Sequence, residues 1–320
     1  MLSLNQNAYE LVQKLCTKST EYCVSVKKTE LGATLIDAGI QAKGGFTAGR
    51  IVTEICMGGL GKARIFSKRY EDIELPAIFV RTDYPAVATL GSQFAGWQIK
   101  RGDFFAIGSG PARALALKPR DIFDKIKYEE KADVAVMVLE TAKEPPEDLI
   151  EKFSFQCKVS PTQLYIVLVP TTSVAGSTQV SGRIVETGIH KLSKLGVDPL
   201  SIRYAWGHSP IAPVHPKFAE AMGKMNDVIL YGGVVYYTLE HKDDDELKAL
   251  LKKAPSSVSQ HYGKPFSEIF KEANYDFYKI DPNLFAPAVF IVNNITTGSI
   301  FQVGEVNVDV LRQSLGLAIF

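Results

Sequence analysis

Three consecutive segments decide the fold: Leu164-Tyr-Ile-Val-Leu-Val169, then Pro170 with Thr171-Thr-Ser-Val-Ala-Gly-Ser-Thr178, then Gln179-Val-Ser-Gly-Arg-Ile-Val-Glu-Thr-Gly-Ile-His190. The first has the length and apolar composition of a buried strand, and the second is a loop of small polar residues. The third begins a helical pattern that spans 180–195. Open α/β sheets bind ligands where a strand enters a helix through such a loop. The sequence therefore predicts an α/β fold with a binding site at this loop.

Arg183 and Glu186 are the candidate chemical groups of this helix. Because they are three residues apart, they share one helix face near its start. A guanidinium paired with a carboxylate at the mouth of a crevice is a candidate acid/base site. A solvated surface pair is the alternative, and most pairs at this spacing are of that kind. Ser181 and Gly182 favour the functional interpretation, since small residues let a ligand approach the backbone.

Length and charge exclude several classes of protein. At 320 residues the chain is long enough for two lobes, and its 36 basic and 35 acidic residues nearly cancel. Nucleic acid is therefore a disfavoured partner, because phosphate binding needs clustered lysine and arginine.

The four cysteines form no CxxC pair, as expected of reduced thiols. Without a membrane-length apolar run or a signal-peptide pattern, we expect a cytoplasmic protein with no membrane partner.

Hydrophobic periodicity predicts the order of helices and strands. Before residue 130 the predicted elements are a helix over 4–20, β segments at 23–27, 34–38, 63–66 and 77–82, a helix over 85–95, and extended structure over 97–107. From 133 to 240, strands at 134–139, 164–169, 202–205 and 228–239 alternate with helices at 147–157, 180–195 and 218–225. This alternation predicts βαβ units and a largely parallel sheet.

The C-terminal part is predicted to complete an arrangement of two lobes. The charged stretch 241–253 indicates a solvated helix, and two β segments flank a possible turn at Thr297-Gly298 before a last helix over 308–315. We expect two α/β lobes with mixed sheets and a cleft between them. The first comprises residues 1–130 and 262–320, and the second comprises residues 131–261.

A second glycine-rich element, Gly108-Ser109-Gly110-Pro111-Ala-Arg113, is a candidate anion-binding turn. Its backbone N–H groups at a helix start could face an anion, with Arg113 adding charge. It lacks the third glycine of a dinucleotide fingerprint and the lysine of a P-loop. An ordinary strand–turn–helix joint is the alternative.

Other candidate groups each have a simple structural alternative. Ser173, Ser177 and Ser181 lack the Gly-x-Ser-x-Gly surroundings of a nucleophile and suit capping instead. Asp83 lies at a predicted helix start, where it either faces the cleft or caps the helix. Tyr278 lies in an aromatic segment, which either stacks on a flat ligand or packs in the core. The five histidines are scattered, and Glu186 with His190 would give two ligands where a catalytic zinc needs three, so we expect no metal.

Several motifs together resemble the methenyltetrahydromethanopterin cyclohydrolases. The matching segments extend from Gly44 to Pro282, and the 108–119 run is long enough to be specific. They are Gly44-Gly-Phe-Thr-Ala-Gly49, Cys56-Met-Gly-Gly-Leu60, Thr82-Asp-Tyr-Pro-Ala-Val87, Gly108-Ser-Gly-Pro-Ala-Arg-Ala-Leu-Ala-Leu-Lys-Pro119, Ser181-Gly-Arg-Ile-Val-Glu-Thr-Gly188, Pro210-Ile-Ala-Pro213, Asn226-Asp-Val-Ile-Leu-Tyr-Gly-Gly233, Tyr262-Gly-Lys-Pro-Phe266 and Asp276-Phe-Tyr-Lys-Ile-Asp-Pro282.

The resemblance implies a cytoplasmic, homotrimeric hydrolase of one-carbon metabolism, as in methanogenesis, that uses no metal or added cofactor. Its substrate would be a pterin-type one-carbon carrier, whose methenyl bridge it opens reversibly to the 5-formyl compound. The family's catalytic carboxylate falls on Glu186 and its partnering arginine on Arg183. Ser109, Gly110, Arg113, Asp83 and Tyr278 are the expected substrate-binding residues.

Two hypotheses follow for individual groups. Glu186 would take a proton from the attacking water and protonate the departing nitrogen, while Arg183 keeps it ionised and oriented. The 108–113 helix start would hold a phosphate or carboxylate of the pterin tail, so that replacing Arg113 raises the Michaelis constant far more than it lowers turnover.

Two other functions compete with this interpretation. A Rossmann-type oxidoreductase would need a full Gly-x-Gly-x-x-Gly and a later acidic ribose ligand, which the chain lacks. A non-catalytic pterin-binding protein of the same fold would tolerate the loss of Glu186.

Overall fold

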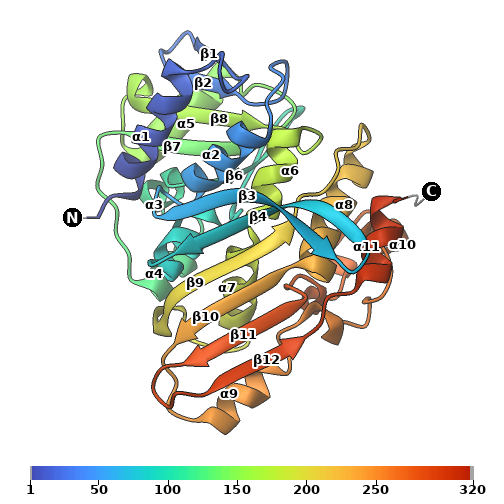
Figure 1. The fold of residues 1–320 in the computed structure, drawn as a ribbon. Helices are drawn as coiled ribbons and strands as arrows, with labels where there is room; N and C mark the ends of the chain where they lie inside the picture. The colour runs from blue at the N-terminus through green and yellow to red at the C-terminus, as the bar shows by residue number, and fades with distance from the viewer. Residues whose placement is uncertain (1, 318–320) are drawn as a thin grey trace. The chain divides into compact units, whose positions relative to one another are not determined.

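The computed structural model describes residues 2–317, which form two compact units (Figure 1). Unit 1 extends to Ala63 and continues over Ala86–Gln179, and unit 2 comprises Arg64–Pro85 and the described residues from Val180 onward. These ranges differ from the predicted division at 130/131 and 261/262. Strand pairing is the reason, because a strand joins the unit that holds its hydrogen-bonded neighbours, however distant in sequence.

Unit 1 is built on a six-stranded mixed sheet. Its strand order is β1-β2-β8-β7-β6-β5. The pairs β2–β8 and β8–β7 are parallel, and the remaining pairs are antiparallel. The strands are β1 (Ser25–Lys28), β2 (Thr34–Asp37), β5 (Trp97–Arg101), β6 (Phe104–Ser109), β7 (Ala135–Glu140) and β8 (Leu164–Val169).

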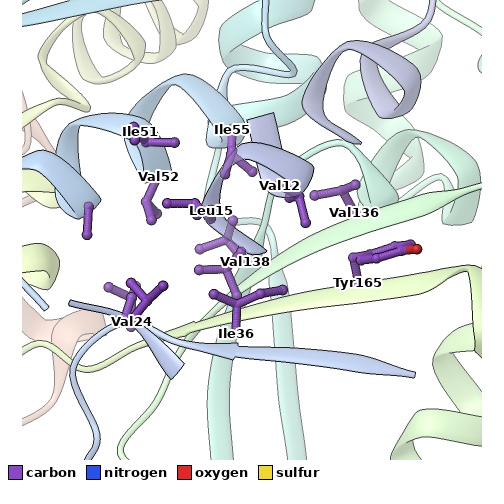
Figure 2. Packing of buried hydrophobic residues seen from close by; sticks show 14 of the residues in the cluster. Val12, Leu15, Val24, Ile36, Ile51, Val52, Ile55, Val136, Val138 and Tyr165 are labelled. Carbon is purple, nitrogen blue, oxygen red and sulfur yellow. The ribbon is translucent and has the colours of Figure 1, made fainter. Parts of the chain in front are cut away.

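The central strand β8 is buried along its whole length because helices cover both faces of this sheet. Tyr165, Val167 and Val169 belong to one core cluster, together with residues of α1 (Leu4–Thr17) and α2 (Phe46–Cys56). Figure 2 shows side chains of these two helices against those of the central strands. The alternate β8 residues belong to a second cluster with α5 (Glu147–Cys157). This arrangement explains why the sequence shows a continuous apolar run with no alternation.

The remaining helical elements of unit 1 are short. They are the π-helix η1 (Val87–Gln93), α3 (Ala112–Ala116), α4 (Arg120–Ile126) and η2 (Pro161–Gln163). The helix α6 (Val174–Ser181) follows β8 and reaches the boundary with unit 2. The sequence patterns gave no prediction for α2.

Unit 2 is built on a second six-stranded mixed sheet, with the order β12-β11-β10-β9-β4-β3. The strands are β3 (Gly61–Tyr70), β4 (Ile73–Thr82), β9 (Ile202–Pro210), β10 (Val234–Leu239), β11 (Val289–Asn294) and β12 (Ile300–Gly304). The β11–β12 hairpin confirms the turn predicted at Thr297-Gly298. The helices are α7 (Ile184–Lys194), α8 (Phe218–Gly232), α9 (Asp244–Leu251), α10 (Phe266–Glu272) and α11 (Val308–Leu315), with short turns η3 (Pro199–Ser201), η4 (Ser256–Val258), η5 (Phe277–Lys279) and η6 (Pro282–Leu284).

The prediction of one largely parallel sheet over 133–240 was wrong. Parallel β7 and β8 belong to the sheet of unit 1, whereas β9 and β10 are antiparallel neighbours in the sheet of unit 2. The predicted strand 228–239 starts only at Val234, because the residues before it complete α8. A short apolar run has the same composition in a buried helix and in a buried strand, so periodicity alone could not separate them.

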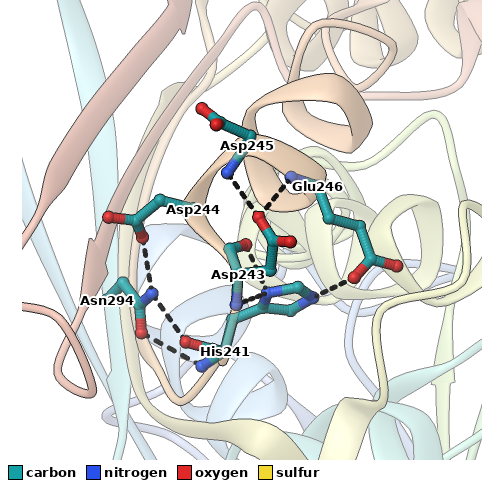
Figure 3. A network of polar contacts seen from close by, with 6 residues as sticks. All are labelled: His241, Asp243, Asp244, Asp245, Glu246 and Asn294. Carbon is teal, nitrogen blue, oxygen red and sulfur yellow. Dashed lines mark hydrogen bonds and ion pairs between the residues drawn. The ribbon is translucent and has the colours of Figure 1, made fainter.

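The charged stretch after β10 forms α9, as predicted, and its start is held by a polar network (Figure 3). The Asp243 carboxylate accepts hydrogen bonds from the backbone N–H groups of Asp245 and Glu246, at 2.8 and 3.0 Å, and so caps the helix. Asn294, at the end of β11, donates to the His241 carbonyl and to Asp244, both at 2.8 Å. The network therefore joins the helix start to the β11–β12 hairpin.

A buried carboxyl in unit 2 predicts a dependence of stability on pH. Asp227 accepts hydrogen bonds from the Phe266 N–H at 2.9 Å and the Ser314 hydroxyl at 2.5 Å, and its burial raises its pKa to about 7. Its ordinary pKa is 3.8, so between about pH 4 and 7 the folded chain binds more protons than the unfolded chain at this site. The site's contribution to the free energy of unfolding therefore falls as pH rises, by at most about 1.4 kcal/mol per pH unit.

We expect Asp227→Asn, which cannot ionise, to lose this contribution. Urea unfolding of wild type and variant across that pH range would measure the two slopes. Equal slopes would show that Asp227 keeps an ordinary pKa in the folded chain.

Candidate functional site

The helix start that carries Arg183 and Glu186 is the most distinctive polar feature of unit 2. The predicted helix over 180–195 is in fact two helices, because the chain leaves α6 after Ser181 and enters α7 at Ile184. Arg183 occupies the N-cap position of α7, with φ −82° and ψ 3°, and Glu186 lies in the first turn. Gly182 and Arg183 thus form the break between the two helices.

Burial decides between the two interpretations of this pair. Arg183 is 8% exposed and Glu186 is 6% exposed, so they do not form a solvated surface pair. A buried charge is costly unless other groups compensate it. The N-terminus of α7 supplies one such compensation for Glu186, since the helix dipole places partial positive charge there. The arrangement can therefore hold an ionised carboxylate out of bulk water, as an acid/base group requires.

The predicted loop 171–178 is shorter than expected, because α6 begins at Val174. The Ser173 hydroxyl donates to the Pro170 carbonyl at 2.8 Å and accepts from the Gly176 N–H at 2.9 Å. This is the capping role that the structural alternative predicted for Ser173. Ser177 and Ser181 are fully buried in α6.

The glycine-rich turn at the end of β6 belongs to unit 1. Ser109 is 1% exposed, and Gly110 has a positive φ of +90°, which favours glycine. The Gly110 N–H donates to the Ser92 carbonyl at 2.9 Å, so this amide is already used within the protein. The following helix, α3, has only five residues. These contacts favour the strand–turn–helix joint over an anion cradle, and substrate binding by Ser109 and Gly110 stays a prediction.

Arg113 lies in the interior of unit 1, with 0% of its surface exposed. Its Nε donates to the Lys118 carbonyl at 2.7 Å, and its Nη1 donates to the carbonyls of Leu90 and Ser92 at 3.0 and 3.2 Å. The guanidinium also lies over the rings of Phe94 and Phe123, with centroid distances of 5.3 and 5.6 Å. These contacts support a structural role for Arg113 and not the expected contact with the pterin tail.

Asp83 and Tyr278 are both exposed on unit 2. Asp83 follows β4, where the Thr82 hydroxyl accepts a hydrogen bond from the Tyr84 N–H at 3.0 Å. Tyr278 is 96% exposed on η5, so the aromatic segment does not bury this ring in the core. Their binding roles stay predictions.

A buried cluster around Cys56 in unit 1 was not singled out as a site by the sequence reasoning. The thiol lies at the end of α2, 3.7 Å from the Ser109 hydroxyl and 4.0 Å from the Gln179 side-chain oxygen. The signal that could have found it is the Cys56-Met-Gly-Gly motif, whose glycines, Gly58 and Gly59, both have positive φ values. Ser109 is thus placed beside a polarisable thiol and a carboxamide.

Residues 2–317 hold no group of three or more His, Cys, Asp or Glu residues arranged to bind a metal ion. No helix in the same range is both long and apolar enough to cross a membrane.

The amino-acid sequence is similar to one protein family over nearly its whole length. The sequence model of a family described as "Cyclohydrolase (MCH)" matches residues 3–315. The chain is 46% identical over 323 residues to the methenyltetrahydromethanopterin cyclohydrolase of Methanothermobacter marburgensis, covering 99% of this chain and 100% of that protein. It is 46% identical over 319 residues to the protein of that name from Methanocaldococcus jannaschii, and 40% identical over 317 residues to that of Methanococcoides burtonii, each covering 99% of both chains.

Proposed function

The chain belongs to the cyclohydrolase family, and from this premise we propose that it hydrolyses the methenyl bridge of methenyltetrahydromethanopterin to give 5-formyltetrahydromethanopterin, with Glu186 as the proton-transfer group. The observation that carries the assignment of Glu186 is its burial in the first turn of α7, three residues after the arginine N-cap. Arg183 orients the carboxylate and helps to keep it ionised.

The proposed reaction uses an electrophile that needs little activation. The methenyl carbon lies between two nitrogens that share a positive charge, so a negative carboxylate stabilises the substrate cation. Water oxygen bonds to this carbon as Glu186 takes the proton. The tetrahedral intermediate then collapses: its hydroxyl oxygen loses a proton as the carbonyl forms, and the departing nitrogen keeps the C–N bond pair and receives the proton from Glu186. One proton is released overall, and the reverse steps close the ring.

We propose that this chemistry uses the residues of the chain with no metal and no added cofactor, and that it takes place in the cytoplasm. The direct test follows the absorbance of methenyltetrahydromethanopterin on addition of the wild-type protein in buffer containing a chelator. Rapid loss of the methenyl chromophore with formation of the 5-formyl product would support the assignment. An inactive, folded protein would reject it, and activity that appears only with added metal would reject the metal-free mechanism.

We propose further that the chain forms a homo-oligomer, a trimer, through one face of the unit 2 sheet. Phe79, Trp206 and Tyr236 come from β4, β9 and β10 and lie on the face opposite the buried residues Val235 and Tyr237. The Trp206 and Tyr236 rings stack at 5.3 Å with an interplanar angle of 4°, and Phe79 lies 5.7 Å from Trp206. All three side chains are partly exposed, which is unusual for so aromatic a surface.

The size of this face supports a second copy of the chain as its partner. Six strands about 4.8 Å apart, each presenting about 17 Å of length, give on the order of 500 Å² of flat surface. A stable interface buries about 800 Å² on each partner, so this face could provide its larger part.

Placing a charge on this face is expected to dissociate the oligomer. We expect Trp206→Glu to shift the molar mass in light scattering from that of a trimer to that of a monomer, because a desolvated carboxylate opposes association. The matched control is Phe155→Glu, which changes a ring of α5 in unit 1 that is 83% exposed. A folded Trp206→Glu variant that keeps the wild-type mass would show that the interface lies elsewhere.

A further inference from the structure

A tyrosine of the adjacent sheet, Tyr237, hydrogen-bonds to the backbone of the first α7 turn, which carries Glu186. Tyr237 lies on β10 with 0% of its surface exposed, and its hydroxyl donates a hydrogen bond of 2.8 Å to the carbonyl of Val185. Val185 immediately precedes Glu186, so the Tyr237 hydroxyl is hydrogen-bonded to the backbone next to the residue that carries the carboxylate. A fully buried hydroxyl with one fixed acceptor leaves this turn little freedom to rotate or slide.

A glycine of α7 makes this approach possible. A Cβ atom at Gly188 would lie 2.1 Å from the Tyr237 hydroxyl oxygen and 3.1 Å from the ring carbon that bears it. Glycine inside a helix costs roughly 1 kcal/mol relative to alanine. Its presence at this position is therefore explained by the close approach of the phenol, which any side chain would prevent.

Tyr237 also interacts electrostatically with the Glu186 carboxylate. Burial raises the pKa of Tyr237 well above its ordinary value, and the negative charge of Glu186 adds to this rise. Tyr237 thus stays a neutral hydrogen-bond donor at any pH at which the protein works. The charge interaction places the phenol within electrostatic range of Glu186, while its hydrogen bond goes to the backbone.

We propose that Tyr237 is a positioning residue for the cyclohydrolase reaction, which fixes the first turn of α7 so that the Glu186 carboxylate meets the attacking water in one geometry. The inference rests on the proposed role of Glu186. A misplacement of about 1 Å at a proton-transfer group costs up to roughly a hundredfold in rate. Since the negative charge of Glu186 remains in such a variant, the effect should fall on turnover and leave the Michaelis constant nearly unchanged.

The test is Tyr237→Phe, with Tyr231→Phe as the matched control. Tyr231 is also a fully buried phenol of unit 2, and it donates to a backbone carbonyl, that of Lys264, at 2.7 Å. Tyr237→Phe loses this one hydrogen bond, whereas Tyr231→Phe also loses the one that its hydroxyl accepts from the Gly263 N–H at 3.3 Å. A purely structural role therefore predicts at least as large an effect for Tyr231→Phe as for Tyr237→Phe. We expect kcat to fall roughly tenfold for Tyr237→Phe with KM within twofold of wild type, and both constants to stay near wild type for Tyr231→Phe.

A double variant separates positioning from packing. In Gly188→Ala/Tyr237→Phe the added methyl group enters the space of the lost hydroxyl but lies 3.1 Å from the ring carbon and 3.3 Å from Pro287 Cγ, so the ring must shift by a few tenths of an ångström. Alanine favours the helix, and a recovered thermal unfolding midpoint shows that the site accommodates the methyl group. A structural role predicts that kcat recovers with it, whereas positioning predicts that kcat stays low because the hydrogen bond to Val185 is still missing. This comparison holds even where Tyr237→Phe alone is too unstable to assay.

The outcomes distinguish this inference from the function on which it rests. Wild-type kcat in folded Tyr237→Phe, together with an inactive Glu186→Gln, would overturn the role of Tyr237 and leave the proposed function in place. Recovery of kcat in the double variant would overturn it in the same way. An active Glu186→Gln would instead overturn the proposed catalytic carboxylate.

Discussion

Replacing Glu186 with glutamine is expected to lower kcat for hydrolysis of methenyltetrahydromethanopterin by a factor of roughly a hundred to ten thousand, the usual contribution of a positioned acid/base group. Glutamine keeps the size and hydrogen-bonding atoms of the side chain but cannot accept and return a proton. It also removes the negative charge that stabilises the substrate cation. The loss should therefore appear in kcat and in kcat/KM together.

A second buried glutamate provides the control for this experiment. Glu54 on α2 is 5% exposed, and its carboxylate pairs with Arg50 at 2.7 Å and with Lys62 at 3.6 Å in unit 1. We expect Glu54→Gln to keep most of the wild-type kcat, although it loses charge at a similarly buried position. If the folded Glu186→Gln variant hydrolyses the substrate at the wild-type rate, the proton-transfer group is another residue.

Replacing Arg113 with alanine is expected to destabilise unit 1 by roughly 4 kcal/mol or more. The change would remove the guanidinium donor from the Lys118 and Leu90 carbonyls, while the Ser92 carbonyl keeps its hydrogen bond from the Gly110 N–H. It would also open a cavity between Phe94 and Phe123. Each buried polar group that loses its partner costs about 1–3 kcal/mol, and the cavity adds to this. Denaturant unfolding of the wild type and the variant would measure the difference.

Arg113→Lys separates charge from geometry at this position. Lysine keeps the positive charge but cannot match the planar guanidinium fork, so we expect it to recover only part of the lost stability. The Michaelis constant of the folded fraction should stay close to that of wild type in both variants. A strongly raised Michaelis constant with unchanged stability would instead support the tail-binding role that the sequence suggested.

Arg183 and Arg113 show why a sequence pattern can predict the surroundings of one side chain and not those of another. Both follow small residues at a predicted helix start; Arg183 was expected to orient the Glu186 carboxylate, and Arg113 was expected to face an anionic group of the substrate. Arg183 is the N-cap of α7, whose first turn carries Glu186, whereas Arg113 is enclosed by backbone carbonyls and aromatic rings. These enclosing groups come from segments as far as 23 residues away, and no local pattern records their approach.

Elements whose signals are local were predicted well. Helices over 147–157 and 308–315 and the strand over 164–169 have the predicted bounds, because periodicity and end signals lie within the segment itself. The break at Gly182–Arg183 and the extension of α8 to Gly232 were missed. In both cases the deciding factor is what the segment packs against, which overrides its intrinsic preference.

The sequence by itself determined the α/β class, the mixed composition of strands and helices, the cyclohydrolase family through its motifs, and the position of Arg183 and Glu186 at a helix start. Tertiary structure alone decided which strands share a sheet, that Arg183 and Glu186 are buried, and that Tyr237 reaches the backbone beside Glu186 through the space left by Gly188. The physical reason is the range of the interactions. Helical and strand periodicities arise between residues two to four positions apart, whereas strand pairing and burial depend on residues that are far apart in the chain.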